Sequence, residues 1–433
     1  MRLLSYLALT GVLAITAVLP VRSAESTISK PLTLDSAVRI ALENHNQIGI
    51  AESRREAAEA RLTQSRSAWF PRVTPSYQHT SQKLSSGLST SRNTTAISLQ
   101  QTIFDSGIRE TNIAQSRDAL RSSEYSLEDT RQGVILNATT AWYELRRSKE
   151  LVKVADSGVE RARTTLEATK AFVEAGSSPK KDVLQAQADY QNALVSQLRA
   201  RNDVRLAQTN LKIAIGVMSV EPVDVVETEV AVPSAEPDNR PLADIIAQAY
   251  ANRPDLKSAE TNVKSSERSV RIARIEAGPM LESSFSAGHQ FDPDRYDTHS
   301  LMATVTYPLF DAGASKASVK AAKASLKQAE ESIELSRRAI AQEVESAWLT
   351  REEARQRITA AQAALAASRE NYAAASESRK EGAGTILDVI TAQNQLVTAE
   401  TNAVQAVYDY HTASARLERA LGSNDPSNTG VKP

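Results

Sequence analysis

The side chains that could support catalysis or metal binding are five histidines and a run of aspartates. The histidines show no helical pairing of the kind that metal ligands use. They are His45, His79, His289, His299 and His411. No glycine-rich phosphate-binding loop follows a strand-like segment. The sequence therefore predicts that the chain is not an enzyme and carries no cofactor.

The segment from His289 to His299 is the best candidate for a metal site. Its aspartates Asp292, Asp294 and Asp297 alternate with other residues and could coordinate a divalent cation. The segment lacks the glycine and the terminal glutamate of an EF-hand loop. A solvated loop is therefore the favoured interpretation, and no metal site is predicted.

Two further carboxylates stand just after glycine-containing turns. Asp182 follows the turn at 174–179, and Asp388 follows the turn at 381–385. Each turn interrupts a long helical pattern, with glycine at a C-cap position and, in the first turn, a proline that can begin the next helix. The macrodipole favours a negative charge in the first turn of a helix. Helix capping is therefore one role open to both aspartates.

These elements recur because the chain is a tandem duplication. Residues 104–107, Phe-Asp-Ser-Gly, return at 310–313 as Phe-Asp-Ala-Gly, an offset of 206. The same offset relates Gly176 to Gly382, and upstream of the strands the offset is 208. A repeat of this length is not a solenoid unit. The predicted organisation is repeat 1 over 24–216, a proline-rich acidic linker over 217–241 and repeat 2 over 242–422.

Long helices dominate each repeat. Apolar residues recur in heptads from 108 to about 175, and the pattern returns in phase 206 residues later. A sustained heptad predicts left-handed coiled-coil packing, and at about 1.5 Å per residue each helix runs roughly 100 Å. The helices that follow the turns keep the heptad, so each repeat contains a long antiparallel helical hairpin. A shorter helix precedes the strands in each repeat, over 33–67 and 242–277.

Segments of alternating polarity lie between the helices. Strands are predicted over 72–83, 95–103, 280–290 and 300–310, with polar turns at 84–91 and 292–297. Such segments suit tilted transmembrane strands, which need ~9–11 residues and one apolar face. Solvent-facing hairpins are the alternative. The residues predicted to face lipid are Leu301, Val305, Tyr307, Leu309, Ile97, Leu99 and Ile103.

An open sheet edge cannot face lipid, because its unpaired N–H and C=O groups would find no partners there. The strands of one chain are too few to close a barrel, so several chains must combine them. The predicted fold is therefore mainly α with a transmembrane β part. Three chains would form a trimeric 12-stranded β-barrel, continued by a long α-helical coiled-coil barrel.

The N-terminus and the composition indicate an exported protein. Arg2, an apolar run from Leu3 to Leu19 and the small residues around the cleavage site indicate a signal peptide over 1–23. The chain has no cysteine, which excludes a lipobox, disulfides and thiolate metal sites. A net charge of −1 does not indicate nucleic-acid binding. Residues 423–433 are predicted to be a disordered tail.

Several short elements, taken together with the duplication, are specific to one family. They are Leu32 to Ala37, Ala41 to Asn44, Pro71, Pro279, Pro308 to Gly313 and Leu387 to Ile390. In these elements the chain resembles the TolC-type outer membrane efflux proteins, in the branch without a lipid anchor. The resemblance implies a homotrimer in the outer membrane that extends into the periplasm. It also implies an exit duct for efflux or type I secretion that docks to a periplasmic adaptor and an inner-membrane ABC or RND pump.

The resemblance also implies roles at the turns. In the family, carboxylates just past the turn narrow the periplasmic tip, and Asp388 occupies that position, with Asp182 as its counterpart in repeat 1. The family's second carboxylate is here Thr391, and the tyrosine and arginine that tether the closed tip are replaced by Arg379 and Gly384. The tip is therefore expected to be less tightly latched, or latched by other pairs. The residues expected to meet the adaptor are Gly176, Ser177, Gly382, Ala383 and Gly384.

A soluble periplasmic coiled-coil scaffold or adaptor subunit is the alternative function. Adaptors also carry a helical hairpin, but usually a single one flanked by β domains. This chain instead has two hairpins separated by amphipathic strands, which favours the exit duct.

Overall fold

The computed structural model describes residues 31–83, 89–219, 221–227, 240–292 and 294–423. The predicted signal peptide, most of the linker and nearly all of the tail lie outside these ranges. The order helix, helix, strand, strand, long helix, returning helix occurs twice. In chain order the elements are α1 (Leu34–Asn44), α2 (Asn46–Ser67), β1 (Arg72–Lys83), β2 (Ser89–Phe104), α3 (Ile108–Glu174), α4 (Lys180–Ala214), α5 (Leu242–Asn252), α6 (Pro254–Ile275), β3 (Met280–Asp292), β4 (Tyr296–Thr306), α7 (Ala314–Lys380) and α8 (Ile386–Ala420).

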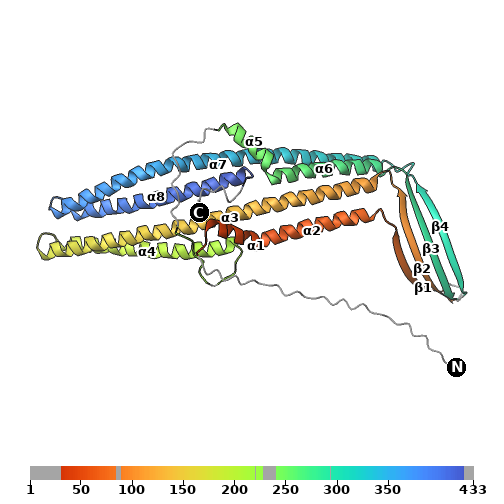
Figure 1. The fold of residues 1–433 in the computed structure, drawn as a ribbon, viewed down its shortest axis with the longest axis horizontal. Coiled ribbons are helices and arrows are strands. Elements are labelled where there is room, and N and C mark those ends of the chain that lie inside the picture. The colour runs from red at the N-terminus through yellow and green to blue at the C-terminus, as the bar shows by residue number, and fades with distance from the viewer. Residues whose placement is uncertain (1–30, 84–88, 220, 228–239, 293, 424–433) are drawn as a thin grey trace, which may run out of the picture.

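The chain forms an elongated helical body with a sheet at one end and two helical turns at the other (Figure 1). Next to the sheet, α2, α3, α6 and α7 pack side by side as a wall. Toward the turns, the hairpins α3–α4 and α7–α8 pack together through α3 and α8. The short helices α1 and α5 lie midway along the body. Among the described residues, no helix combines the length and apolar character needed to span a bilayer.

The helices predicted over 33–67 and 242–277 are each broken in two, which corrects both predictions. His45 adopts an extended conformation, and its Nδ1 accepts a hydrogen bond from the backbone N–H of Gln47 at 3.2 Å. Arg253 is also extended, and Pro254 is the first residue of α6. A residue before proline is disfavoured in the helical region, because the proline ring clashes with it. Both breaks therefore have local causes.

The sheet has the order β1-β2-β3-β4, and all neighbouring strands are antiparallel. The fourth strand runs over Tyr296–Thr306 instead of the predicted 300–310, so Tyr307 and Leu309 lie beyond it. Its pairing ends at Thr306 opposite Met280, and Pro308 has no backbone N–H with which to extend the ladder. The predicted turns are shorter than expected, since β2 begins at Ser89 and β3 extends to Asp292.

A buried arginine fixes the first strand-to-helix junction. The Asp105 carboxylate accepts hydrogen bonds from the backbone N–H groups of Gly107 (3.2 Å) and Arg109 (3.0 Å). The Arg109 guanidinium donates to the carbonyl of Thr102 at 2.7 Å and lies over the Trp69 ring, 4.3 Å from its centroid. The side chain therefore ties the start of α3 to the end of β2.

The second junction keeps the carboxylate and loses the arginine. Asp311 accepts hydrogen bonds from the backbone N–H groups of Gly313 (2.9 Å) and Ser315 (2.8 Å). Ser315 stands where repeat 1 has Arg109. Gly107 and Gly313 both have a positive φ near 90° (92° and 91°), a conformation that glycine adopts without strain.

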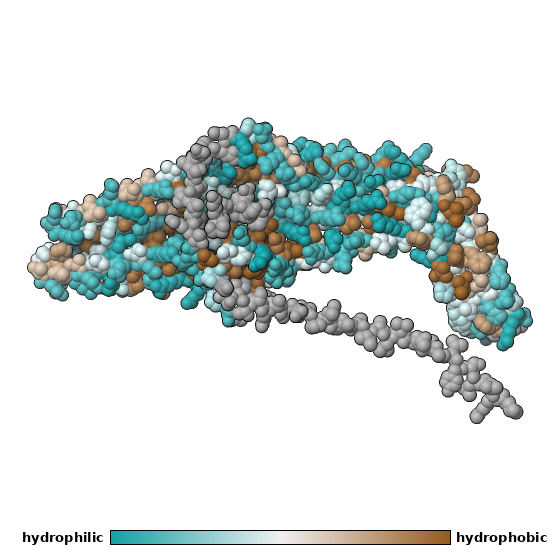
Figure 2. Space-filling model, viewed as in Figure 1, coloured by the Kyte–Doolittle hydropathy of each residue, from teal (hydrophilic) through white to brown (hydrophobic). Residues whose placement is uncertain are grey.

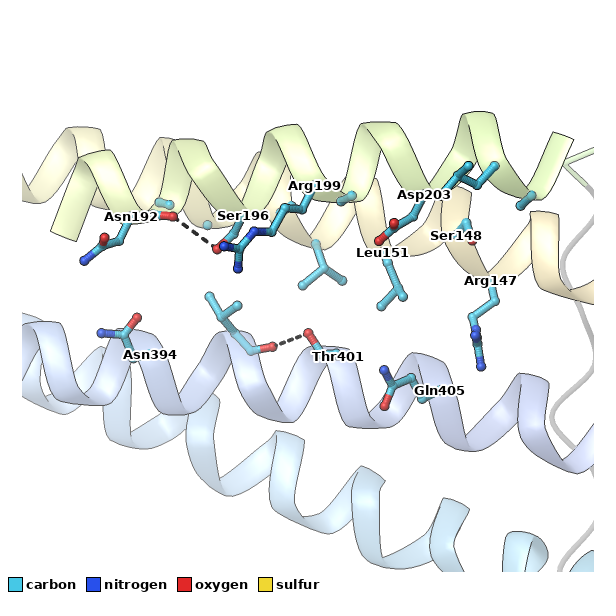
Figure 3. A pocket seen from close by; sticks show the side chains of 18 of the residues that line it. Arg147, Ser148, Leu151, Asn192, Ser196, Arg199, Asp203, Asn394, Thr401 and Gln405 are labelled. Carbon is cyan, nitrogen blue, oxygen red and sulfur yellow. Dashed lines mark hydrogen bonds between the residues drawn. The ribbon is translucent and has the colours of Figure 1, made fainter. Parts of the chain in front are cut away.

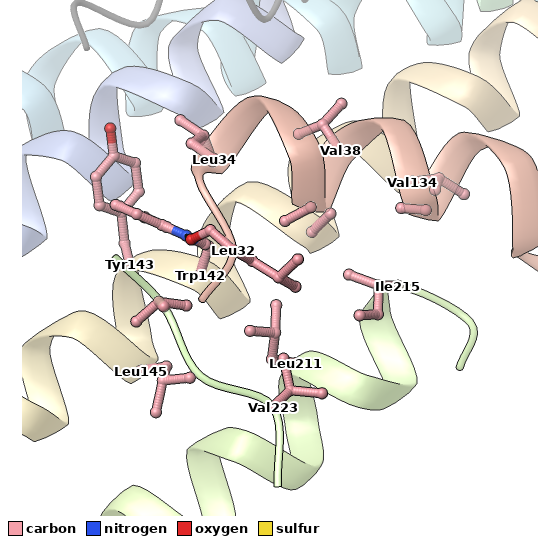
Figure 4. Packing of buried hydrophobic residues seen from close by; sticks show 14 of the residues in the cluster. Leu32, Leu34, Val38, Val134, Trp142, Tyr143, Leu145, Leu211, Ile215 and Val223 are labelled. Carbon is pink, nitrogen blue, oxygen red and sulfur yellow. The ribbon is translucent and has the colours of Figure 1, made fainter. Parts of the chain in front are cut away.

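The largest apolar cluster lies where α1 packs on α3 and α4 (Figure 4). Leu34 and Val38 of α1 contact this cluster together with Tyr143 and Leu211. The indole N–H of Trp142 donates to the Leu32 carbonyl at 3.0 Å, and Leu32 pairs in parallel with Val225. These contacts fasten the first described residues to the middle of the helical body. A second cluster around Ile245, Leu256, Ile340 and Leu417 does the same for α5.

Two pairs of glycines end the long helices in different surroundings. Gly216 and Gly422 have positive φ, and a Cβ on either would lie 2.9 Å from the backbone of the helix break that it contacts. For Gly216 the nearest atom is the Asn44 carbonyl oxygen, and for Gly422 it is the Arg253 nitrogen. Gly176 and Gly382 also have positive φ, but nothing lies within 4 Å of an added Cβ.

We therefore expect Gly216→Ala and Gly422→Ala to destabilise the protein more than Gly176→Ala and Gly382→Ala. All four variants incur the left-handed backbone cost of about 1–2 kcal/mol, and the first two add a backbone clash. Thermal unfolding followed by circular dichroism measures the difference. Equal unfolding midpoints in all four variants would contradict the assignment of close contact at Gly216 and Gly422.

Candidate functional site

The two helical turns lie together at the end of the body farthest from the sheet (Figure 1). Each ends its helix with the same pair of backbone hydrogen bonds. Gly176 N–H donates to Val173 (3.0 Å) and Ser177 N–H to Phe172 (2.9 Å). In the second turn, the N–H groups of Gly382 and Ala383 donate to Arg379 (3.2 Å) and Ser378 (2.9 Å). This is the Schellman arrangement, which requires a left-handed residue at the glycine.

The turn glycines have different physical roles. Gly176 and Gly382 are needed for their positive φ, and the space around them is open. At Gly384, an added Cβ would lie 3.2 Å from the backbone nitrogen of Arg379, so this glycine permits a close approach. Within the chain, only Gly384 of these three turn glycines permits a close approach of two backbone segments. Gly176 and Gly382 instead lie on open surface.

Asp388 closes a capping box at the start of α8. Its Oδ2 accepts hydrogen bonds from the Thr385 backbone N–H (2.9 Å) and from the Thr385 hydroxyl (2.7 Å). In return, the Thr385 hydroxyl accepts from the Asp388 N–H at 3.2 Å. The side-chain and backbone hydrogen bonds from Thr385 lower the pKa of the Asp388 carboxyl. This exposed carboxylate is therefore charged at neutral pH and held in one orientation.

Asp182 occupies the corresponding position in α4 but has a different environment. Its side chain is 10% exposed, and its Oδ2 lies 3.5 Å from a guanidinium nitrogen of Arg379. The prediction grouped Asp182 with Asp388 as gate carboxylates. In a single chain, the structure instead pairs Asp182 with a cation and leaves Asp388 exposed.

Arg379 joins the two hairpins at the tip. Besides Asp182, its guanidinium donates to the Ser178 hydroxyl and, at 3.3 Å, to the Gly384 carbonyl. It also lies over the Phe172 ring, 5.2 Å from the centroid. We call this set of contacts the Arg379 bridge. In the sequence, Arg379 departs from the family pattern. No sequence pattern predicts its partners, which include residues of the other hairpin.

A second polar bridge lies farther from the turns. The Asp189 carboxylate of α4 accepts hydrogen bonds from the side-chain amides of Gln393 (2.9 Å) and Asn394 (3.2 Å) of α8. The Thr165 hydroxyl of α3 donates to the Gln393 side-chain carbonyl at 3.3 Å. Burial raises the pKa of Asp189. The sequence did not predict this bridge, because a glutamine and an aspartate within a helical heptad are typical of surface positions.

An open groove runs between the hairpins and includes the residues of this bridge in its lining (Figure 3). Its cavity volume is about 680 Å³, and α3, α4 and α8 line it. Arg147, Arg199 and Asp203 point into it together with amides and hydroxyls (Figure 3). No cluster of three metal-ligating side chains occurs in the part of the chain that the structure describes. The hairpins pack together through α3 and α8, while α4 reaches α8 at few points, one of which is the Asp189 bridge.

At the other end of the molecule, the strand register gathers apolar side chains on one face of the sheet. Val73, Leu99, Phe285 and Leu301 are paired in succession across all four strands. Figure 2 shows brown, hydrophobic residues on the sheet. The neighbouring row, on the opposite face, is polar and consists of Thr74, Ser98, Ser286 and Ser300. The sheet thus has one apolar and one polar face.

The residues predicted to face lipid fall on or near the apolar face. Leu301 and Val305 are 78% and 70% exposed, and their strand pairs them with Phe285 and Leu281. Ile97 is exposed and Leu99 is half-buried. A bulge between Thr102 and Phe104 puts Phe104, and not Ile103, opposite Leu281. Tyr307 and Leu309 are exposed in the segment after β4.

The segment from His289 to His299 is mostly strand, so its interpretation as a loop is wrong. His289 and Asp297 are opposite each other on β3 and β4, and His289 Nδ1 lies 2.7 Å from Asp297 Oδ1. His299 pairs with Ala287 on the same face. A single histidine–aspartate pair offers too few ligands for a divalent cation.

The chain matches the family model described as "Outer membrane efflux protein" over residues 37–217 and 245–423. It is 23% identical to the outer membrane efflux protein BepC of Brucella suis over 414 residues, which is 92% of this chain and 87% of that protein. It is 21% identical to the outer membrane protein TolC of Escherichia coli over 418 residues, covering 92% and 84%. The fold matches a crystal structure of CusC with a TM-score of 0.80 at 16% identity, covering 90% and 92%.

The Arg379 bridge predicts a specific change at the tip. We expect Arg379→Ala to broaden and lengthen the distance between spin labels placed at Ser177 and Ala383, because the hairpins lose their contact there. Lys380→Ala is the matched control, since Lys380 pairs with Glu377 of its own helix at 3.0 Å. The distance is measured by double electron–electron resonance on a chain that has no native cysteine to compete for the label. An unchanged distance in Arg379→Ala would mean that the bridge does not hold the hairpins.

Proposed function

The chain belongs to the outer membrane efflux protein family, and we propose that it is the outer membrane exit duct of a tripartite efflux or type I secretion system. It is a homotrimer that spans the outer membrane and extends into the periplasm. Its sheets combine into a 12-stranded β-barrel, and its helices continue that barrel as a tube. The duct is a passive channel without an enzymatic activity of its own.

The observation that carries this proposal is the sheet at the end of the long helices. Its apolar row crosses all four strands, and β1 and β4 each leave one edge unpaired within the chain. Neither edge can face lipid without a partner, because backbone groups there would lose their hydrogen bonds. Several copies of the chain remove both unpaired edges, since β4 of one copy can pair with β1 of the next. The apolar row can then face lipid.

The partners follow from the position of the turns. In the assembled duct they are the periplasmic tip, where a periplasmic adaptor docks and connects the duct to an inner-membrane ABC or RND pump. The open surface at Gly176, Ser177, Gly382 and Ala383 suits contact with the adaptor's own helical hairpin, since small residues let backbones approach closely. The soluble scaffold considered as an alternative offers no explanation for the exposed apolar row on the sheet.

The tip carries the gate of the proposed duct. Three symmetry-related Asp388 carboxylates would form an acidic ring that attracts cations and repels anions. The Arg379 bridge holds the two hairpins of each chain together beside this ring, with Asp182 as the anionic partner of the arginine. Because this bridge lies within one chain, opening would move the two hairpins of that chain together.

Insertion into the membrane distinguishes the two faces of the sheet. Val305→Arg places a charge on the apolar face and is expected to cost ~2–4 kcal/mol near the bilayer midplane. Thr304→Arg places the same charge on the opposite, polar face and should cost far less. The yield of assembled trimer in the outer membrane fraction measures both variants. Equal yields would rule out the membrane assignment of this face.

Asp388→Asn tests the gate. We expect the variant to lose cation selectivity and to bind a blocking divalent cation roughly tenfold more weakly, because the ring loses its charge. Bilayer conductance recordings measure both quantities. Glu381→Gln, at an exposed carboxylate in the same turn, is the control. If Asp388→Asn conducts as the unmodified protein does, the carboxylate acts as a helix cap alone.

A further inference from the structure

The first turns of α7 carry a stripe of lysines. Lys316, Lys320, Lys323 and Lys327 are spaced by four, three and four residues, so they share one helix face. All four are exposed, and none forms an ion pair with another residue in the described ranges. Like charges four residues apart weaken a helix by a few tenths of a kcal/mol. The stripe is therefore not explained by the stability of α7.

A stripe of opposite charge runs along α2. Glu52, Glu56 and Glu59 have the spacing of four and three residues, and all three are exposed. Glu59 makes a long contact of 3.5 Å with Arg55 of its own helix, and Glu52 lies 3.4 Å from Arg131. These surface pairs are weak and leave the carboxylates accessible.

The two stripes belong to the two outer helices of the wall beside the sheet. Within the chain, α2 packs on α3 and α7 packs on α6, so each has an unoccupied side (Figure 1). A closed ring of identical copies uses a head-to-tail interface. Such a ring brings α7 of one copy against α2 of the next.

Both stripes fall on the same side of that wall. At about 100° per residue, the lysines lie roughly 80° on average around α7 from the half-buried seam with α6 that contains Val319 and Leu326. The glutamates lie roughly 110° on average, in the same sense of rotation, around α2 from its seam, which contains Ala58 and Leu62. Because α2 runs toward the sheet and α7 runs away from it, rotations of the same sense in the two helices point to the same side of the wall. Lysines and glutamates therefore flank one interface.

The duplication supplies the register of this interface. The contact between α3 and α6 inside the chain is the counterpart of the contact between α7 and α2 of two chains. Gln115 donates to the Ser269 hydroxyl at 2.8 Å, and the Ser122 hydroxyl lies 3.1 Å from the Asn262 side-chain carbonyl. The offsets of 206 for α3 and 208 for α6 translate these pairs into Ala321 beside Arg61 and Gln328 beside Arg54.

This register aligns the charges. It places Lys323 level with Glu59 and Lys327 within one residue of Glu56, and long side chains span the remaining gap. It also places Lys316 level with Arg66, a like charge. We propose that Lys323–Glu59 and Lys327–Glu56 are ion pairs between neighbouring chains that set the axial register of the subunits. The proposal rests on the trimeric duct proposed above.

A charge exchange tests the pairing on the full chain purified in detergent. Lys323→Glu with Lys327→Glu should speed the dissociation of the trimer at low salt roughly tenfold, since two attractions at each interface become repulsions. Glu56→Lys with Glu59→Lys should have the same effect. All four substitutions together should return the rate to within about twofold of the unmodified protein. Native mass spectrometry over a range of NaCl concentrations measures the trimer.

The control lies on the same stripe. Lys316→Glu faces Arg66 in this register and should leave the trimer as stable as before or stabilise it. The pairing would be overturned by any of three results. These are a trimer weakened by Lys316→Glu, a trimer that neither double reversal affects, and a trimer that the fourfold variant does not restore. A chain without substitutions that is not a trimer would instead contradict the proposed function itself.

Discussion

The sheet of a single chain cannot pair all of its backbone N–H and C=O groups. The other features of the molecule follow from that constraint. β1 and β4 each carry one unpaired edge, while the face between them is apolar along the row from Val73 to Leu301. Apolar side chains favour lipid, and unpaired amides are excluded from it. Closure with other copies resolves the conflict. It also forces the helices that extend from the strands into a closed tube, in which α2 and α7 must find partners.

The long elements could be predicted because their signals are local and repeated many times. The heptads predicted a helix from Ile108 to about Ala175, and α3 ends at Glu174. Alternating polarity predicted the first strand with its observed bounds, Arg72–Lys83. Each such pattern sums many small preferences along one segment, so an error at one position does not change the outcome. The duplication then confirmed each element by its second copy.

The features that could not be predicted depend either on a single residue or on contacts between residues far apart in the sequence. The break at Arg253 follows from Pro254, a local signal that the single helix predicted over 242–277 did not take into account. The bulge that replaces Ile103 with Phe104 opposite Leu281 depends on how β2 meets β3. The Arg379 bridge joins residues about two hundred positions apart, and no periodicity encodes that contact. The candidate site was therefore located at the turns, while its internal contacts required the structure.

The Arg379 bridge breaks the symmetry that the duplication creates. Three duplicated chains present six similar hairpins, which would give the tip a pseudo-sixfold iris. The counterpart of Arg379 in the first repeat is Val173, which has no charge to offer. Among its described residues each chain thus holds one bridge of this kind, between its own two hairpins. The two hairpins of each chain would therefore move together, and the aperture would widen with threefold instead of sixfold symmetry.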